Sequence, residues 1–258
     1  NTVMVKDSIF VGNTYDLNLT SGTTSNITFI NSSLNKNKLR VPANSYAYFK
    51  SYVNVNVSLN SGLPGSNINV KAYDSLDQIQ DTGSTASNGI VRLNVMEFYR
   101  SNNINYFVTP SLIKITQANY SQNSTSIDLY NITEQDVNLT TVLLSCGSAV
   151  SSNFEMGNNF NCQAFGLNVT AGNVTIDGFY YNLTGNGSGN GIDFYQIQTN
   201  SVKRLTLQNF SRAVNFYYTN NTNLTGLRIV NNTIGIYFDH SHNNYVYDTI
   251  LGNNTNIS

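Results

Sequence analysis

The sequence predicts an all-β protein that combines coils of a parallel β-helix with an antiparallel β-sandwich. Three observations lead to this fold class: a 22-residue repeat within residues 191–258, a series of short alternating apolar segments, and a composition rich in asparagine, threonine and serine. We expect one or two terminal β-helix coils or N-terminal strands over residues 1–49, the sandwich over residues 50–144, and a β-helix with 22-residue repeats over residues 145–258.

The repeat places residues of the same kind at the same position of three successive copies. The equivalent residues are Gly191, Ala213 and Gly235; Ile192, Val214 and Ile236; Phe194, Phe216 and Phe238; Val202, Leu224 and Val246; and Leu207, Ile229 and Leu251. Within each copy the apolar residues lie two apart, which indicates short strands with one inward face, whereas a helical solenoid would need apolar spacings of three and four. A period of about 20–25 residues with three short strands is typical of a parallel β-helix, in which like residues stack from coil to coil.

An earlier and less regular coil is expected over residues 164–190, with its extra length in the loop of residues 186–190. The residues expected to match the next coil are Leu167 and Val169, for Ile192 and Phe194, and Val174 and Ile176, for Leu205 and Leu207. Before this coil, Cys146 and Cys162 close a loop of about 17 residues. A disulfide bond there would tie down the first turn, where no preceding coil supplies hydrogen bonds, and would stabilise the fold by about 3 kcal/mol. Two free thiols are the alternative.

Residues 50–144 contain six or seven short segments in which apolar and polar residues alternate. Turn signals separate these segments, as in Ser61-Gly-Leu-Pro-Gly65. The pattern is typical of an antiparallel β-sandwich. Residues 27–33 align with residues 205–211, so further β-helix coils would fit within residues 1–49.

Parts of the chain resemble known families. Residues 235–254 resemble right-handed parallel β-helix repeats of the pectate-lyase-like, nitrous-oxide-reductase-accessory type, and residues 145–178 resemble the opening of such domains in secreted archaeal surface proteins. Residues 53–89 are similar to the immunoglobulin-like fold shared by carboxypeptidase-regulatory-like domains. The turn residues of that family correspond here to Gly62, Pro64, Asn88 and Gly89. The resemblances imply right-handed parallel β-helix coils with an immunoglobulin-like antiparallel β-sandwich, and they bear on fold rather than on activity.

The composition limits the partners and the compartment. Charged residues make up 10% of the chain and the net charge is −1, which gives no indication of binding to nucleic acid or to an anionic membrane. No apolar run approaches the roughly 18 residues that a membrane span needs. The sequence begins without a charged-then-apolar leader and Asn1 is not an initiator methionine, so we expect a processed or excised piece.

The motif Asn-x-Ser/Thr occurs 18 times, whereas about 9 occurrences would be expected by chance from the composition. The excess predicts an exterior, heavily N-glycosylated protein, and the turn chemistry of Asn-rich β repeats is the alternative explanation. The predicted acceptors are Asn18, Asn26, Asn56, Asn119, Asn123, Asn131, Asn138, Asn168, Asn173, Asn182, Asn186, Asn220 and Asn223.

Strand parity predicts a different role for other asparagines with this motif. Asn209, Asn231 and Asn253 follow the inward residues of their strands at even spacing, so we expect them to face inward, to form a hydrogen-bonded ladder and to carry no glycan. Asn31 is expected to behave likewise. The asparagines expected to face solvent on the same argument are Asn56, Asn168 and Asn223.

We expect no catalytic, cofactor-binding or metal-binding residues. Pectate-lyase-like folds include polysaccharide lyases and hydrolases, which need paired acids or a calcium site with a nearby base. No two acids of the β-helix are expected to stack on adjacent coils, and Asp177 is assigned to a turn. The acids in question are Glu155, Asp177, Asp193, Asp239 and Asp248. We therefore expect a protein that is not an enzyme.

Other side-chain clusters are expected to be structural. His240 and His242 could ligate a metal together with a nearby acid, but they read as a solvated turn. The remaining clusters are Asp74, Asp77 and Asp81, whose spacing fits no standard calcium loop; Lys36, Lys38 and Arg40, expected to form a solvated edge; and Tyr195, Tyr217 and Tyr237, expected to be surface aromatics rather than a sugar-stacking platform.

These observations predict a structural subunit or segment of a glycosylated extracellular assembly at the cell surface, such as a filament, sheath or S-layer. The expected partners are copies of the chain or neighbouring surface-layer subunits, covalent N-glycans and surface polysaccharides. An uncapped coil after Leu251 is expected to pair with the coil-like residues 1–49 of the next copy, and artificial ends of an excised piece are the alternative. The alternative functions are a carbohydrate-binding or adhesion module and a polysaccharide lyase or hydrolase.

Overall fold

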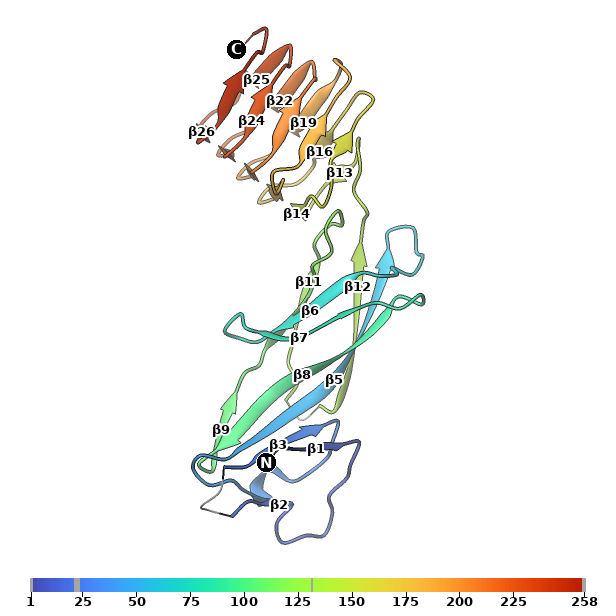
Figure 1. Ribbon diagram of the computed structural model, residues 1–258, viewed down its shortest axis with the longest axis vertical. Coiled ribbons are helices and arrows are strands. Elements are labelled where there is room, and N and C mark those ends of the chain that lie inside the picture. Colours follow the sequence, from blue (N-terminus) through green and yellow to red (C-terminus); the bar gives the residue numbers. More distant parts are fainter. Residues whose placement is uncertain (1, 21–23, 131, 257–258) are drawn as a thin grey trace. The chain divides into compact units, whose positions relative to one another are not determined.

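The structure is a computed structural model that describes residues 2–20, 24–130 and 132–256. Strands dominate it, and the described residues contain one short helix, a 3-10 turn at Lys36–Lys38. The all-β prediction is therefore confirmed. The chain divides into two compact units, which are described separately below (Figure 1). The first unit comprises Asn1–Thr116 and Asn123–Thr141, and the second comprises Gln117–Gln122 and Val142–Ser258.

The second unit is a parallel β-solenoid in which each coil contributes one strand to each of three five-stranded sheets (Figure 1). The first sheet contains β13 (Ala149–Val150), β16 (Leu167–Val169), β19 (Asn190–Tyr195), β22 (Arg212–Tyr217) and β25 (Ile234–Asp239). The second contains β14 (Phe154–Glu155), β17 (Thr175–Asp177), β20 (Ser201–Lys203), β23 (Asn223–Thr225) and β26 (Tyr245–Tyr247). The third contains β15 (Phe160–Asn161), β18 (Asn182–Thr184), β21 (Thr206–Gln208), β24 (Arg228–Val230) and β27 (Ile250–Gly252). The predicted parallel β-helix is thus confirmed.

The strand register of the solenoid follows the 22-residue repeat. Phe194 pairs with Phe216, and Phe216 pairs with Phe238, so each partner lies 22 residues further along the chain. Their rings stack with centroids 5.0 Å and 4.9 Å apart. Leu207 pairs with Ile229 in the same way, and both side chains are fully buried. The core is therefore a column of like residues, as the repeat predicts.

One coil departs from the predicted alignment. The prediction that placed Ile176 opposite Leu207 is wrong, because Ile176 pairs with Val202 and Leu183 pairs with Leu207. The cause is the turn of residues 178–181, which puts four residues between β17 and β18 where later coils have two. The extra length of this coil is therefore not confined to its glycine-rich loop.

The first unit is built around the long strand β5 (Tyr46–Leu59). One edge of β5 pairs in parallel first with β3 (Asn26–Ile30) and then with β12 (Glu134–Thr141). The other edge pairs antiparallel with β8 (Ile90–Ser101). The sheet is completed by β1 (Thr2–Lys6), parallel to β3, and by β9 (Ile104–Phe107), antiparallel to β8.

The amino-terminal part of this unit winds in coil-like turns. Successive parallel pairs join β1, β3 and β5, and a second parallel pair joins β2 (Leu17–Asn18) to β4 (Leu39–Arg40). Phe29 and Phe49 stack inside these turns with centroids 5.2 Å apart. The end of the predicted coil region at residue 49 lies within β5, so this strand belongs both to the coil-like turns and to the sheet that follows.

A second sheet of the first unit is entirely antiparallel. Its order is β11 (Ser124–Ile127), β10 (Ser111–Ile115), β6 (Asn69–Tyr73) and β7 (Ile79–Ser84). The prediction of an antiparallel sandwich does not hold for β12, which runs parallel to β5. Both β3 and β12 pair in parallel with β5, so β12 runs in the same direction as the coil strand β3. The immunoglobulin-like topology stays a prediction.

Candidate functional site: an open solenoid edge and its polar surface

The last described coil exposes residues that the preceding coil buries. The exposed fraction is 0% for Phe216, Leu224 and Ile229 and 41%, 39% and 38% for their respective partners Phe238, Val246 and Leu251. Within the described residues, the outer side of this coil carries a single isolated bridge, between Ile234 and Asn256. Among the described residues, the outer edge of β25, β26 and β27 therefore carries an apolar column and strand edges on which a further coil, of the same protein or of another copy, could stack.

The other end of the solenoid is covered. Residues 117–122, which connect β10 and β11, lie against the first coil, where Ser121 forms an antiparallel bridge with Phe154. The backbone N–H of Asn119 donates to the carbonyl oxygen of Glu155 at 2.9 Å. These contacts satisfy backbone groups that a first coil would otherwise leave unpaired.

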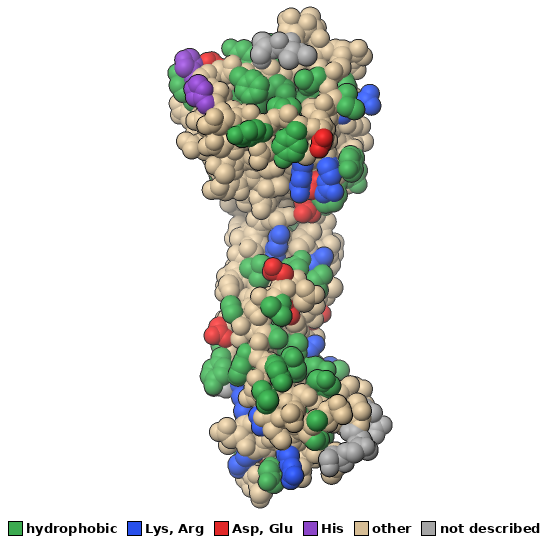
Figure 2. Space-filling view, turned by 90° about the vertical axis from the view of Figure 1, so that its left-hand side faces the viewer, with side chains coloured by type: hydrophobic (Ala, Val, Ile, Leu, Met, Phe, Trp, Pro, Cys, Tyr) green, Lys and Arg blue, Asp and Glu red, His purple; other side chains and the backbone are tan. Residues whose placement is uncertain are grey.

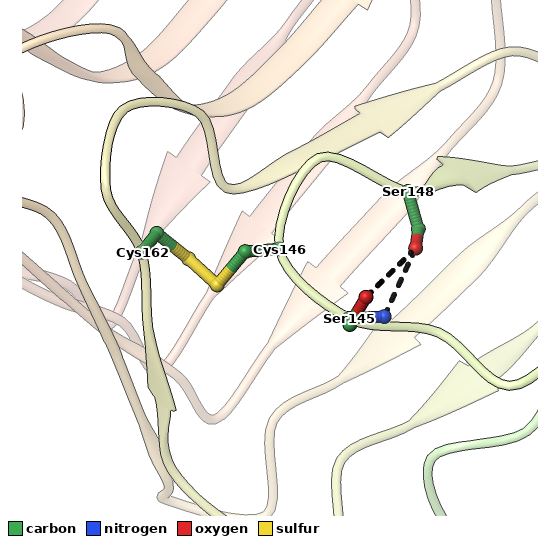
Figure 3. The surroundings of a disulfide bond; sticks show 4 residues. All are labelled: Ser145, Cys146, Ser148 and Cys162. Atoms are coloured by element: carbon green, nitrogen blue, oxygen red, sulfur yellow. Dashed lines mark hydrogen bonds between the residues drawn. A yellow bond between two sulfur atoms is a disulfide. The ribbon is translucent and has the colours of Figure 1, made fainter.

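A disulfide bond between Cys146 and Cys162 adds a covalent link at the covered end (Figure 3). The two Cα atoms are 5.4 Å apart, and Cys162 is buried in the solenoid core. Beside it, the backbone N–H of Ser145 donates to the hydroxyl of Ser148 at 3.0 Å, closing the turn that leads into β13 (Figure 3). The link closes the chain of the first coil into a loop, which limits the conformations of the unfolded chain.

The expected inward ladder of Asn209, Asn231 and Asn253 is wrong, because all three residues are exposed. Each has a left-handed backbone, with φ of 59°, 57° and 53°. A left-handed residue ends the alternation of the strand, so the residue that follows it turns inward instead. Asn232 is buried there, and its side-chain amide donates to the Oδ1 atom of Asn254 at 3.0 Å. The last two coils thus pair asparagines one position further along, whereas the coil before them has Phe210 there, whose backbone N–H donates to Oδ1 of Asn232 at 2.9 Å.

The predicted glycan acceptors differ in accessibility. Those that are exposed are Asn18, Asn56, Asn123, Asn138, Asn168, Asn173 and Asn186. Those that are half-buried are Asn26, Asn119, Asn182, Asn220 and Asn223, and Asn131 lies outside the described residues. The Nδ2 atom of Asn119 donates to Asn158 at 2.9 Å, and that of Asn31 donates to Asp7 at 2.6 Å, so both amides are occupied by hydrogen bonds. The exposed asparagines named above are therefore accessible candidate glycosylation sites, and they occur on both units.

Two acids lie opposite each other on adjacent coils, contrary to expectation: Glu155 pairs with Asp177 in the register of β14 and β17. Asp177 is buried and accepts hydrogen bonds from Arg204, and the Nζ atom of Lys203 lies 3.2 Å from its carboxylate. Burial alone would raise the pKa of Asp177, but the hydrogen bonds from Arg204, the backbone N–H of Phe179 and Lys203 outweigh it and lower the pKa. A carboxylate held charged in this way is poorly suited to act as a general acid.

The described residues contain no group of three or more His, Cys, Asp and Glu side chains able to hold a metal ion. The Nδ1 atom of His240 lies 2.5 Å from Asp239, and the ring stacks on Tyr218 with centroids 4.6 Å apart. Asp74 accepts hydrogen bonds from the backbone N–H groups of Leu76 and Gln78 at 2.9 Å and 2.8 Å. Asp74 and His240 therefore have structural contacts in their turns.

The basic cluster near the amino terminus is not a solvated edge throughout. Lys36 Nζ lies 2.6 Å from the buried Glu97 and 4.8 Å and 4.7 Å from the ring centroids of Phe98 and Tyr130. Lys36 therefore neutralises a buried carboxylate. The charge pattern around Lys36 could not predict this pair, because Glu97 lies 61 residues further along the chain. Lys38 donates to the backbone carbonyl of Asn13 at 2.6 Å.

The tyrosines of the solenoid are surface aromatics. Tyr195 and Tyr217 stack on each other with centroids 5.0 Å apart, and Tyr237 lies under the guanidinium of Arg212 at 4.0 Å. Much of the face of the molecule shown in Figure 2 consists of backbone and uncharged polar side chains. Such a surface keeps its polarity at any pH, because amides and hydroxyls do not titrate in the physiological range.

Comparisons with known proteins give little guidance. No family model matches the chain, and no curated protein matches it. Among solved structures, one similar chain is an aspartate-to-asparagine mutant of the shaft pilin SpaA from Lactobacillus rhamnosus GG, with 11% identity and a TM-score of 0.30. The match covers 40% of this chain and 52% of the pilin, so it spans about half of the pilin's length. Similarity at this level carries no argument. In the described part of the chain, no helix has the length and apolar character to cross a membrane.

Proposed function

We propose that this chain is a structural, non-catalytic module of a glycosylated extracellular surface assembly, joined end to end through the open edge of its solenoid. The observation that carries the proposal is the stacking of like residues: column side chains are fully buried where a coil lies on both sides, and the column of the last described coil, about 40% exposed, has the same register for a coil stacked on it. Burying these side chains again would supply a hydrophobic driving force, and the strand edges would supply hydrogen bonds.

The proposed partner surface is the outer edge of the coil-like turns in the first unit of a neighbouring copy. There β1 pairs with β3 on one side, and Val3 and Met4 are exposed. The connection after β1 adds the exposed apolar residues Ile9 and Val11. Two different edges would then meet in a heterologous contact, which produces a filament when the rotation between copies does not close a ring.

The disulfide bond and the exposed asparagines in acceptor motifs support an extracellular location. Disulfide bonds persist in oxidising compartments, and Cys146 and Cys162 are paired. Exposed asparagines in acceptor motifs occur on both units, so glycans could cover much of the lateral surface while the solenoid edge stays free. An archaeal origin stays a prediction.

Sedimentation velocity of the full 258-residue chain over a wide range of concentrations tests the assembly. We expect species larger than the monomer, and we expect the double variant Val246→Lys, Leu251→Lys to stay monomeric because it places charges on the edge. The matched control, Phe165→Lys with Tyr195→Lys, adds the same charge at exposed aromatic positions away from β26 and β27 and should assemble normally. A wild-type chain that stays monomeric throughout, or a control that also fails to assemble, would overturn the proposal.

Glycopeptide mass spectrometry of the natively produced protein tests the covalent glycans. We expect occupancy at Asn168 and Asn173, whose side chains are exposed, and none at Asn119, which is half-buried and whose amide is held by Asn158. Finding Asn119 occupied, or finding no glycan at the exposed sites, would contradict this part of the proposal.

A further inference from the structure

The turn between β17 and β18 is an aromatic insertion into the repeat. Two residues connect the corresponding strands β20 and β21, whereas residues 178–181 connect β17 and β18. The insertion contains Phe179, Tyr180 and Tyr181, and all three are exposed. In solenoid proteins, insertions of this kind form loops on one face, which often is the binding face.

Backbone hydrogen bonds within the turn and to the next coil support its conformation. Phe179 and Tyr180 have φ of 45° and 66°, a left-handed backbone that is rare for bulky residues. The N–H of Tyr180 donates to the carbonyl oxygen of Arg204 at 2.6 Å, and the N–H of Tyr181 donates to that of Gly178 at 2.8 Å. The equivalent turns of the later coils also contain a left-handed residue, namely Arg204, Gly226 and Asp248, so this backbone conformation belongs to the turn geometry of the solenoid.

Arg204 supports the turn from the adjacent coil. Its guanidinium lies 4.4 Å from the ring centroid of Phe179 and 5.9 Å from that of Tyr180. The same guanidinium is held by the buried carboxylate of Asp177, with Nε donating to Oδ1 at 3.0 Å. The aromatic side chains therefore rest on a fixed cation, which reduces the entropy that a ligand would have to overcome on binding.

A hollow next to the turn adds polar groups. It has a volume of about 470 Å³, and its walls include Phe179, Tyr181, Met156 and Glu155. The Oε1 atom of Glu155 accepts a hydrogen bond from Gln122 at 3.0 Å, and the carboxylate retains further acceptor capacity. Aromatic surface beside a few fixed hydrogen-bonding groups is the general composition of a small-ligand site.

We propose that this aromatic corner, defined as Glu155, Phe179 and Tyr181 of the hollow together with the adjoining Tyr180 and Arg204, binds a neutral pyranose sugar of a polysaccharide chain. The C–H faces of a pyranose pack on aromatic rings, and its hydroxyls donate to carboxylate oxygens. The charges around the corner balance, because the cations Lys203 and Arg204 face the carboxylates of Asp177 and Glu155. A balanced site favours a neutral sugar over an acidic one.

The other tyrosines of the solenoid are less suited to this role. Tyr195 and Tyr217 cover each other by stacking and lie on regular strands. Tyr180, in contrast, is 74% exposed and projects from an inserted turn. Tyr195 therefore provides a matched control, since it is an exposed tyrosine of the same unit.

A glycan array carrying neutral and acidic glycans, followed by calorimetry with the best neutral oligosaccharide, tests the site in the full chain. Tyr180→Asn removes the ring while keeping a residue that tolerates the left-handed backbone, and we expect its affinity to fall roughly tenfold with an unchanged melting temperature. Tyr180→Phe and the control Tyr195→Thr should bind as the wild type does.

Three outcomes would overturn the proposal: no neutral glycan bound by the wild type, binding restricted to acidic glycans, or a Tyr180→Asn variant that binds normally. If the Tyr180→Asn variant keeps its glycan affinity but no longer self-associates in sedimentation, the corner is a protein contact rather than a sugar site. The sugar proposal does not depend on assembly, because Val246→Lys with Leu251→Lys leaves the corner intact and should bind the same glycan.

Discussion

The two ends of the solenoid differ in how far the terminal coil is covered by other residues. At the first coil, residues 117–122 and the Cys146–Cys162 disulfide cover and fasten the strands. At the last described coil, Phe238 is partly exposed although its equivalent Phe216 is fully buried. In a stacked β-helix each coil is covered by the next, so an inward residue is fully buried only when a coil lies on both sides. A phenylalanine at the same position of the repeat therefore contributes more to the free energy of unfolding in an inner coil than in the last described coil.

The largest effect should come from a charge inside the stack. Leu207→Asp places a carboxylate between Leu183 and Ile229, where no partner is available, and should lower the free energy of unfolding by more than about 4 kcal/mol. Thermal and urea denaturation measure the loss. Thr206→Asp, which changes the neighbouring outward position, serves as the control and should cost far less. A Leu207→Asp protein that melts within a degree or two of the wild type would mean that this column faces solvent.

The next effect compares one column position in two coils. Phe216→Ala should cost about 3–5 kcal/mol because the ring lies between Phe194 and Phe238, whereas Phe238→Ala should cost about 1 kcal/mol in the monomer because its ring is partly exposed. Urea denaturation of dilute protein gives both values. Equal costs would show that something covers the last coil in the isolated chain. A cost for Phe238→Ala that grows with protein concentration would place the ring in the assembly contact.

A smaller effect is expected at the covered end. Replacing Cys146 and Cys162 together by alanine should lower the free energy of unfolding by about 3 kcal/mol, because the unfolded chain regains the freedom of the closed loop. Hydrogen exchange should show the loss of protection beginning in β13–β15 rather than in β22–β24. Reduction of the wild-type protein is the control and should reproduce the same pattern. Protection lost evenly along the solenoid would contradict a local role for this bond.

Periodicity was sufficient to predict the register of the regular coils. Apolar residues at a spacing of two within a repeat of 22 leave one arrangement that buries every column, so Phe194, Phe216 and Phe238 could be paired from sequence. Parity failed at Asn231, because a left-handed residue reverses the direction of the next side chain. Asn-Asn pairs at this position in two coils are the signal that could have indicated it, since asparagine is enriched in left-handed conformations.

Contacts between distant segments could not be predicted in the same way. Residues 117–122 belong to a connection between two strands of the first unit's antiparallel sheet, and nothing in their composition indicates that they cover the solenoid. Glu155 and Asp177 lie 22 residues apart, so the period itself places them opposite each other. The apolar pattern of the repeat is recognisable only from the coil of residues 164–190 onward, so Glu155 has no assigned position in the predicted coils.

The smallest expected effect concerns Asp177, whose pKa is lowered in the folded chain near the covered end. A group with a depressed folded-state pKa adds stability that is fully present above its unfolded-state pKa, about 4, and this stability is lost as the pH falls through the lower folded-state pKa. The difference in unfolding free energy between the wild type and Asp177→Asn should therefore be constant from about pH 5, one unit above the unfolded-state pKa, to about pH 7. The difference should shrink below about pH 4. Urea denaturation at several pH values measures it, with Asp193→Asn as a control acid on the same solenoid. A difference that does not change with pH would mean that the ion pair of Asp177 with Arg204 contributes through packing rather than through charge.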